Sequence, residues 1–147
     1  MTHARVGLVS LALLLGLPAT LHPAGALVTL TVSVDGFENA EGAAGIAVWN
    51  GAQGFPEGIE HAVATTYVPI EDGSASARFE DLAPGAYAVT VYHDRNDNQR
   101  FDKNWLGMPT EAWGVSNDVR PRLRAPRFDE ARLELEAGEQ VVSIGVD

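Results

Sequence analysis

The sequence predicts an all-β protein, a single two-sheet sandwich of about seven short strands with one long irregular loop. Three observations favour this fold. Apolar residues alternate with polar ones in several short runs, no run has the period of a long amphipathic helix, and the 15 Gly and 8 Pro fall mainly between the apolar runs. One domain is expected, because 147 residues are enough to bury a single core.

Five strands are predicted before the long loop and two after it. Most of them alternate polar and apolar residues, which is the period of a strand with one buried face. The predicted strands are residues 28–35, 46–50, 62–70, 74–79, 87–92, 131–136 and 140–146.

The first and fifth of these strands have the clearest patterns. VTLTVSVD, residues 28–35, places an apolar residue at every second position and is rich in β-branched residues. In the fifth strand Tyr87, Val89 and Val91 are predicted to share the buried face. Pro69 predicts an edge position, or the end of a strand, because proline cannot donate to a neighbouring strand.

The chain between residues 94 and 130 has no periodic run and is long for a connection. Loops of this length are typically functional, or are ordered by a bound group. We therefore expect the functional part of the protein to lie in this segment.

The N-terminus has the pattern of a cleaved secretory leader. A short basic start, MTHAR, precedes the apolar run VGLVSLALLLGL, and Ala24-Gly25-Ala26 supplies the small residues of a cleavage site. The run is shorter than the ~20 apolar residues that span a bilayer. We predict a signal peptide at residues 1–26 and a periplasmic or secreted domain at residues 27–147, with no membrane insertion after cleavage.

The composition excludes several classes of partner and site. The formal net charge is -10, which argues against nucleic acid as a partner and disfavours docking on anionic lipid. The chain has no cysteine, so disulfides and thiolate metal sites are excluded. An acidic surface is compatible with binding a cation.

The stretch HDRNDNQRFD, residues 93–102, places oxygen-bearing side chains at alternate positions. Calcium takes about six to eight oxygen ligands, and a tight loop directs alternate side chains at one centre. The spacing therefore predicts a calcium site. Its candidate ligands are the side chains of Asp94, Asn96, Asn98 and Asp102 and the backbone carbonyl of Arg100.

Two departures from a calcium loop leave a second interpretation open. The sixth position, where a glycine is expected, is Gln99, and the twelfth, where a bidentate acid is expected, is Trp105. Glu111 supplies that acid only if the chain folds back. The alternative is a polar turn in which Asn and Asp side chains cap their own backbone. A calcium site here is expected to be weak, with a dissociation constant on the order of 10⁻⁴–10⁻³ M.

Several long motifs give a family resemblance. The run FEDLAPGAYAV resembles the hairpin of transthyretin-like and carboxypeptidase-regulatory-like modules. Together with WNGAQGFP, YHDRNDNQRFD, NWLGMPTEAWGVSND and PRFDEARLEL, it resembles a family of exported bacterial proteins, domain of unknown function family 2141, from about Leu30 to Val146. The resemblance implies a signal peptide, an immunoglobulin-like or prealbumin-like sandwich and no established activity. Gln99 departs from it, because family members usually have glycine at that place of the polar loop.

The tryptophans and arginines give further candidate sites. Trp105 and Trp113 could form a platform for a sugar or peptide, although we expect both to anchor the long loop to the sandwich. RPRLRAPR, residues 120–127, could bind a carboxylate or phosphate group, although pairing with the chain's many acids is the simpler expectation.

Catalysis has little support in the sequence. It contains no Gly-x-Ser-x-Gly, His-Glu-x-x-His or phosphate-loop motif and no cysteine nucleophile. We predict a non-enzymatic, monomeric protein that binds an envelope or extracellular protein or glycan. The main alternative is a carbohydrate- or peptide-binding module that uses Trp105 and Trp113. A hydrolase that uses Asp102 and Glu111 is a third interpretation.

Overall fold

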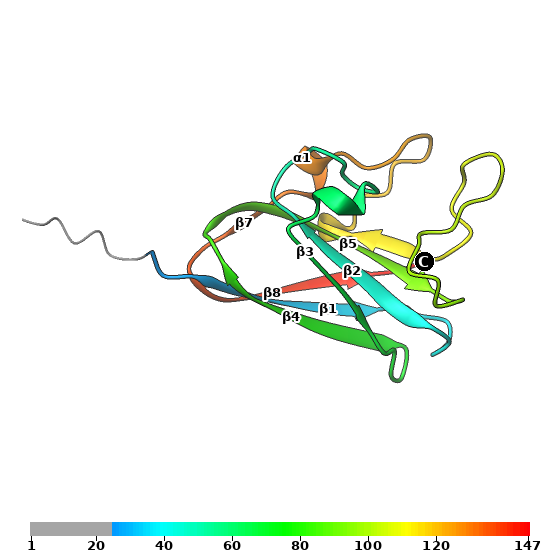
Figure 1. The fold of residues 1–147 in the computed structure, drawn as a ribbon, viewed down its shortest axis with the longest axis horizontal. Helices are drawn as coiled ribbons and strands as arrows, with labels where there is room; N and C mark the ends of the chain where they lie inside the picture. The colour runs from blue at the N-terminus through cyan, green and yellow to red at the C-terminus, as the bar shows by residue number, and fades with distance from the viewer. Residues whose placement is uncertain (1–24) are drawn as a thin grey trace, which may run out of the picture.

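The computed structural model describes residues 25–147, so the predicted signal peptide lies almost wholly outside the described residues. Those residues form two β-sheets packed face to face (Figure 1). The prediction of an all-β sandwich is confirmed. Within residues 25–147, no helix has the length and apolar character needed to cross a membrane.

The smaller sheet has three strands in the order β4-β1-β8. Its central strand β1 (Val28–Asp35) pairs antiparallel with β4 (Ser74–Leu82) and parallel with β8 (Gly138–Gly145). The first strand of the fold therefore lies beside the last, which ties the two ends of the domain together.

The larger sheet has five strands. Its main path is β3-β2-β5-β6, and β7 pairs with the other end of β5. The strands are β2 (Ala43–Trp49), β3 (Ala64–Val68), β5 (Gly85–Asp94), β6 (Trp113–Val115) and β7 (Leu133–Leu135). The short helices are η1 (Ile59–His61), η2 (Ser116–Asp118) and α1 (Phe128–Ala131). Eight strands thus replace the seven predicted, because β6 lies inside the segment expected to be irregular.

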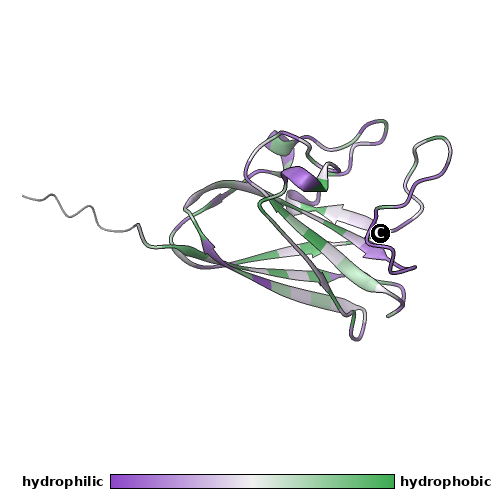
Figure 2. Cartoon of the chain, viewed as in Figure 1, coloured by the Kyte–Doolittle hydropathy of each residue, from purple (hydrophilic) through white to green (hydrophobic). Residues whose placement is uncertain are grey.

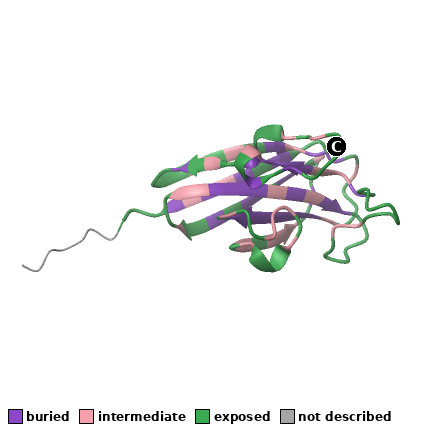
Figure 3. Cartoon of the chain, turned by 90° about the horizontal axis from the view of Figure 1, so that it is seen from above, coloured by how far each residue is buried: buried purple, intermediate pink, exposed green. Residues whose placement is uncertain are grey.

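The main core lies between the two sheets, where the alternation in the sequence turns one face of each strand inward (Figure 2). Val28, Leu30, Val32 and Val34 of β1 are fully buried, whereas the polar residues between them are more exposed. In Figure 3 the buried residues lie mainly along the strands, and most loop residues are exposed. Every strand that the structure describes lies within residues 28–145, and both described hydrophobic clusters lie within residues 28–146. A chain that begins at Leu27 therefore keeps all of these strands and both clusters.

A second hydrophobic cluster covers part of the outer face of the five-stranded sheet. Trp49 is fully buried there, and its indole Nε1–H donates to Oγ1 of Thr90 over 3.0 Å. Phe55 packs edge-on against Trp49 and against Phe128 of α1. This cluster covers only one part of the sheet. The outer face near Tyr92 instead lines a groove together with the loops described below.

Ser116 and Asn117 fasten α1 to this face. The buried Ser116 hydroxyl accepts the backbone N–H of Val89 and donates to the carbonyl of Ala131. The Asn117 amide donates to the carbonyls of Glu130 and Arg132. Ser116 and Asn117 therefore have a structural role in this chain.

Candidate cation loop and the adjoining groove

The predicted cation loop begins where β5 ends. Asp94 is the last residue of β5, is fully buried and pairs with Ala43 of β2. Gly42 has a φ of 65°, and a Cβ built on it would lie 1.8 Å from the Asp94 carbonyl oxygen. The close approach that glycine permits therefore holds the first residue of the loop against β2.

The buried Asp94 carboxylate organises the first turn of the loop. Its Oδ1 accepts the backbone N–H of Asn98 over 3.0 Å, and its Oδ2 accepts that of Gln99 over 2.7 Å. Asp97 and Gln99 adopt left-handed φ values of 56° and 58°. The position where the family usually has glycine thus has the backbone conformation that glycine favours.

A second carboxylate, that of Asp102, gathers the two amide side chains. Nδ2 of Asn96 donates to Asp102 Oδ2 over 2.7 Å, and Nδ2 of Asn98 donates to both carboxylate oxygens over 3.1 and 3.0 Å. The remaining amide oxygens cap backbone N–H groups, those of Asn98 and Arg100. Four predicted ligand side chains are therefore connected in one hydrogen-bond network, and Arg100 joins it through its amide N–H.

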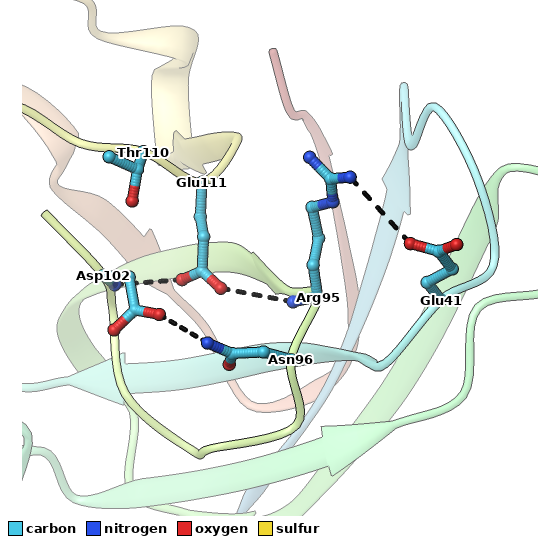
Figure 4. A pocket seen from close by; sticks show the side chains of 6 residues that line it. All are labelled: Glu41, Arg95, Asn96, Asp102, Thr110 and Glu111. Carbon is cyan, nitrogen blue, oxygen red and sulfur yellow. Dashed lines mark hydrogen bonds and ion pairs between the residues drawn. The ribbon is translucent and has the colours of Figure 1, made fainter.

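Glu111 closes the loop from the other side (Figure 4). Its Oε1 accepts the backbone N–H of Arg95 over 3.2 Å, and its Oε2 accepts that of Asp102 over 3.0 Å. Burial raises the pKa of the Glu111 carboxyl; the two N–H donors oppose this rise, and the charges of Asp102 and Asp94 add to it. Three carboxylates consequently share one small region.

The chain does fold back, as a ligand role for Glu111 required. Asn104 Oδ1 accepts the N–H groups of Leu106 and Met108, and the Thr110 N–H donates to the Asp102 carbonyl over 3.0 Å. Trp105, at the twelfth position of the loop spacing, lies at the tip of this turn rather than beside the carboxylates. The sequence contains a signal for this fold-back. Asn104 stands three residues before Gly107, and this combination favours a turn.

Two cations of the loop make their ion pairs with acids outside it. The Arg95 guanidinium faces Glu41 at 3.9 Å, and Lys103 pairs with Glu57. Arg100 lines a groove on the sheet's outer face. Arg95 also lines, with Asn96, Asp102 and Glu111, a shallow depression of about 340 Å³ (Figure 4). Among the described residues, no ion pair joins Arg95, Arg100 or Lys103 to the carboxylates of Asp94, Asp102 or Glu111.

Within residues 25–147, no group of three or more His, Cys, Asp or Glu side chains is arranged to hold a metal ion. A cation here would need the Asn oxygens as well as the carboxylates, a hard oxygen set that suits calcium rather than a transition metal. His93, beside the loop, is buried and its Nε2 lies 2.8 Å from the Glu41 carbonyl oxygen. It packs edge-on against Phe37, which makes it a structural residue rather than a solvated one.

A groove of about 790 Å³ lies beside the cation loop, on the outer face of the five-stranded sheet. Tyr67 and Tyr92 lie over Gly45, with their hydroxyl groups 2.9 Å apart. Tyr67 also donates to the Gln99 carbonyl, and Phe101 packs against Tyr92. Burial raises the pKa of Tyr92, so that side chain is a neutral phenol. An aromatic surface is thus joined to the cation loop.

The two candidate tryptophans lie in different surroundings. Trp113 of β6 is half-buried and lines the groove, with the Arg120 guanidinium 5.5 Å from its ring centre. Trp105 is 90% exposed at the loop tip, so the expectation that it anchors the loop is wrong. The arginine segment forms the opposite wall of the groove, and Arg124 pairs with Glu130 at 2.6 Å, as expected for this acidic chain.

Comparison with known proteins places the chain in a family. The family described as an uncharacterized protein conserved in bacteria, DUF2141, matches residues 32–143. The chain belongs to this family. No curated protein matches it, and no solved structure does. The polar loop and the Ser-Asn segment of this DUF2141 member both lie within the matched residues. The likeness to transthyretin-like modules stays a prediction.

Proposed function

We propose that this protein is an exported, non-enzymatic binding module of the cell envelope whose 94–111 loop is organised by calcium. One observation carries the proposal. Asp94, Asn96, Asn98 and Asp102 belong to one hydrogen-bond network at the end of β5, and the carboxylate of Glu111 closes the loop around them.

The charges of this network favour a cation. Asp94, Asp102 and Glu111 place three carboxylates in one region, whereas the ion pairs of Arg95 and Lys103 are with Glu41 and Glu57. The amide donors of Asn96 and Asn98 partly balance the Asp102 charge in their present orientation. A calcium ion would replace these donors with a full positive charge and draw the amide oxygens toward the same centre. The affinity expected remains on the order of 10⁻⁴–10⁻³ M.

Thermal unfolding of residues 27–147 tests the proposal. Calcium is added after chelator treatment, with magnesium in a parallel series. At 100 times its dissociation constant, a ligand of the native state adds about 2.7 kcal/mol, which raises the midpoint by roughly 5–10 °C. Asp102→Asn should abolish this rise. Asp97→Asn removes the same charge from an exposed side chain outside the network and should keep it. An unchanged midpoint at about 10 mM calcium, or equal loss in both variants, would make the loop a polar turn.

Export is tested separately, by the N-terminal sequence of the protein recovered from the periplasm or medium. Cleavage after Ala26 predicts a chain that starts at Leu27. A protein that stays in the cytoplasm with residues 1–26 attached contradicts this part of the proposal.

A second candidate function is binding of a carbohydrate or peptide, and the groove favours it. Its volume suits a small ligand, and Trp113, Tyr92 and Phe101 supply aromatic surface. Trp105 would contribute only from the loop tip. Tryptophan fluorescence during glycan and peptide titrations tests this candidate. Replacement of Trp113 by Phe should then weaken binding more than the same replacement of Trp105.

A further inference from the structure

The two loops that flank the groove carry exposed apolar side chains at their ends. Trp105 is 90% exposed, Leu106 64% and Met108 56% on the 94–111 loop, and Leu123 is 99% exposed on the loop of residues 119–127. Trp105 and Leu123 are the most exposed large apolar side chains among the described residues. Both loops project from the same side of the five-stranded sheet (Figure 1), and both line the groove between them.

Positive charge is concentrated in the segments of these two loops that line the groove, residues 99–109 and 119–127. The rest of the 94–111 loop carries Arg95 and the acids Asp94, Asp97 and Glu111. Residues 99–109 and 119–127 contain six of the chain's ten Lys and Arg but one of its twenty Asp and Glu. Six cations and one acid give these segments a net charge of +5, whereas the whole chain has -10. The overall charge, which disfavours anionic lipid, therefore does not describe these two segments.

Two of these cations are available to a partner. Lys103, Arg120, Arg124 and Arg127 pair with acids elsewhere in the chain. No ion pair of Arg100 or Arg122 is found within residues 25–147. Arg100, from the 94–111 loop, and Arg122, from the 119–127 loop, both line the groove. An anionic surface that spans the groove would therefore meet a free guanidinium from each loop.

From these observations we propose that the two loop tips dock the protein on an anionic lipid bilayer. Trp105 and Leu123 enter the interfacial region of the bilayer, and Arg100 and Arg122 face the phosphate groups. A bilayer fits better than a protein partner because the apolar side chains project outward on two separate tips. A protein would need a matching pocket for each tip, whereas a bilayer accepts both without any preformed shape. Tryptophan also favours the interface, since its ring is apolar and its N–H is polar.

Residues 27–147 contain every described strand and lack the predicted leader, so they suit a vesicle assay. Vesicles of phosphatidylcholine alone are compared with vesicles that also contain phosphatidylglycerol, in chelator and at about 0.1 M salt. Sedimentation should show binding to the anionic vesicles that weakens as salt is raised. The chelator keeps the test independent of calcium, so failure of docking and failure of the proposed calcium site are distinguishable.

Variants locate the contact. Trp105→Ser and Leu123→Ser should each weaken binding about tenfold, because each removes one inserted apolar side chain. Val141→Ser removes an exposed apolar side chain from β8, in the other sheet, and should change binding less than about twofold. Arg122→Glu should weaken binding about tenfold. Arg78→Glu makes the same change in net charge on β4 and should have a small effect.

The proposal is overturned if the protein does not bind the anionic vesicles, or if Trp105→Ser and Leu123→Ser bind as well as the unchanged chain. Equal loss in Arg122→Glu and Arg78→Glu also overturns it, because net charge alone would then explain binding. Binding to soluble polyglutamate but not to vesicles would identify an acidic polypeptide, rather than a lipid surface, as the partner of this face.

Discussion

The backbone N–H of Asp102 donates to Oε2 of Glu111 over 3.0 Å, so two acidic residues are held side by side at the mouth of a loop. Such a contact is favourable for the backbone donor and unfavourable for the neighbouring charges. Burial of Glu111 adds to the cost of its ionised form, and its pKa is raised as a result. A proton or a cation bound at this point would lower the free-energy cost of placing these charges together.

The raised pKa of Glu111 predicts a specific pH dependence. A carboxyl whose pKa is higher in the folded than in the unfolded state contributes stability that is fully present below the unfolded pKa. That contribution is lost as pH rises through the folded pKa. The free energy of unfolding of the unchanged protein, minus that of Glu111→Gln, should therefore fall as pH rises from below the usual Glu range to neutrality. Urea unfolding at a series of pH values in chelator measures this difference. A difference that grows with pH would show that the pKa of Glu111 is lowered instead.

The pKa of Glu130 is shifted downward, so its contribution to stability should depend on pH in the opposite sense. Its hydrogen bonds to Arg124 and to the Arg127 N–H lower its pKa to about 2. The stability that it contributes is present above the unfolded pKa, near 4.5, and is lost as pH falls toward about 2. NMR titration of the side-chain carboxyl measures this pKa directly. Arg124→Gln should return it toward the ordinary Glu range. Arg122→Gln removes a cation of the same segment that makes no ion pair with Glu130, and it should leave the pKa of Glu130 low. If both variants raise this pKa equally, the shift comes from the general charge of the segment.

Local patterns in the sequence predicted the strands that form the core. Val32, Ala77 and Val89 lie at alternating apolar positions in β1, β4 and β5, and all three are buried as expected. Strand β6 was missed because its three residues are too few to show a period. It is defined instead by pairing with Thr90–Tyr92, more than twenty positions earlier in the chain.

For the candidate site too, the sequence predicted the contacts between residues close in the chain and missed those between distant segments. The four candidate ligand side chains, Asp94 to Asp102, are close in sequence, and their spacing alone predicted that they meet. The approach of Glu111 depends on the turn at Asn104, so the sequence predicted it only conditionally. The groove could not be predicted, because its walls come from Arg100 and Arg122 on segments that only the folded sheet brings together.

Replacing Gln99 by glycine should stabilise the loop. Gln99 has a φ of 58°, a conformation that costs a side-chain-bearing residue about 1–2 kcal/mol but costs glycine little. The greater entropy of glycine in the unfolded chain offsets part of the gain, which leaves a net stabilisation of about 0.5–1 kcal/mol. Denaturant unfolding in chelator measures it. Thr90→Gly, in the extended strand β5, should destabilise the protein. If Gln99→Gly is also destabilising, the side chain makes a contribution that exceeds its backbone strain.

Loss of the Ser116 hydroxyl should weaken the attachment of α1 to the sheet. The hydroxyl is fully buried and joins the Val89 N–H to the Ala131 carbonyl, so Ser116→Ala leaves both backbone groups without this partner. A buried donor or acceptor without a partner costs about 1–3 kcal/mol, and we expect a loss of unfolding free energy in that range.

Ser76→Ala, at an exposed position of β4, is the control and should change the free energy of unfolding by less than about 0.5 kcal/mol. Hydrogen exchange adds a local measurement, because the Val89 amide should lose protection in Ser116→Ala and keep it in Ser76→Ala. Equal protection in both variants would mean that another group, such as water, replaces the hydroxyl and that α1 is held mainly by its apolar contacts.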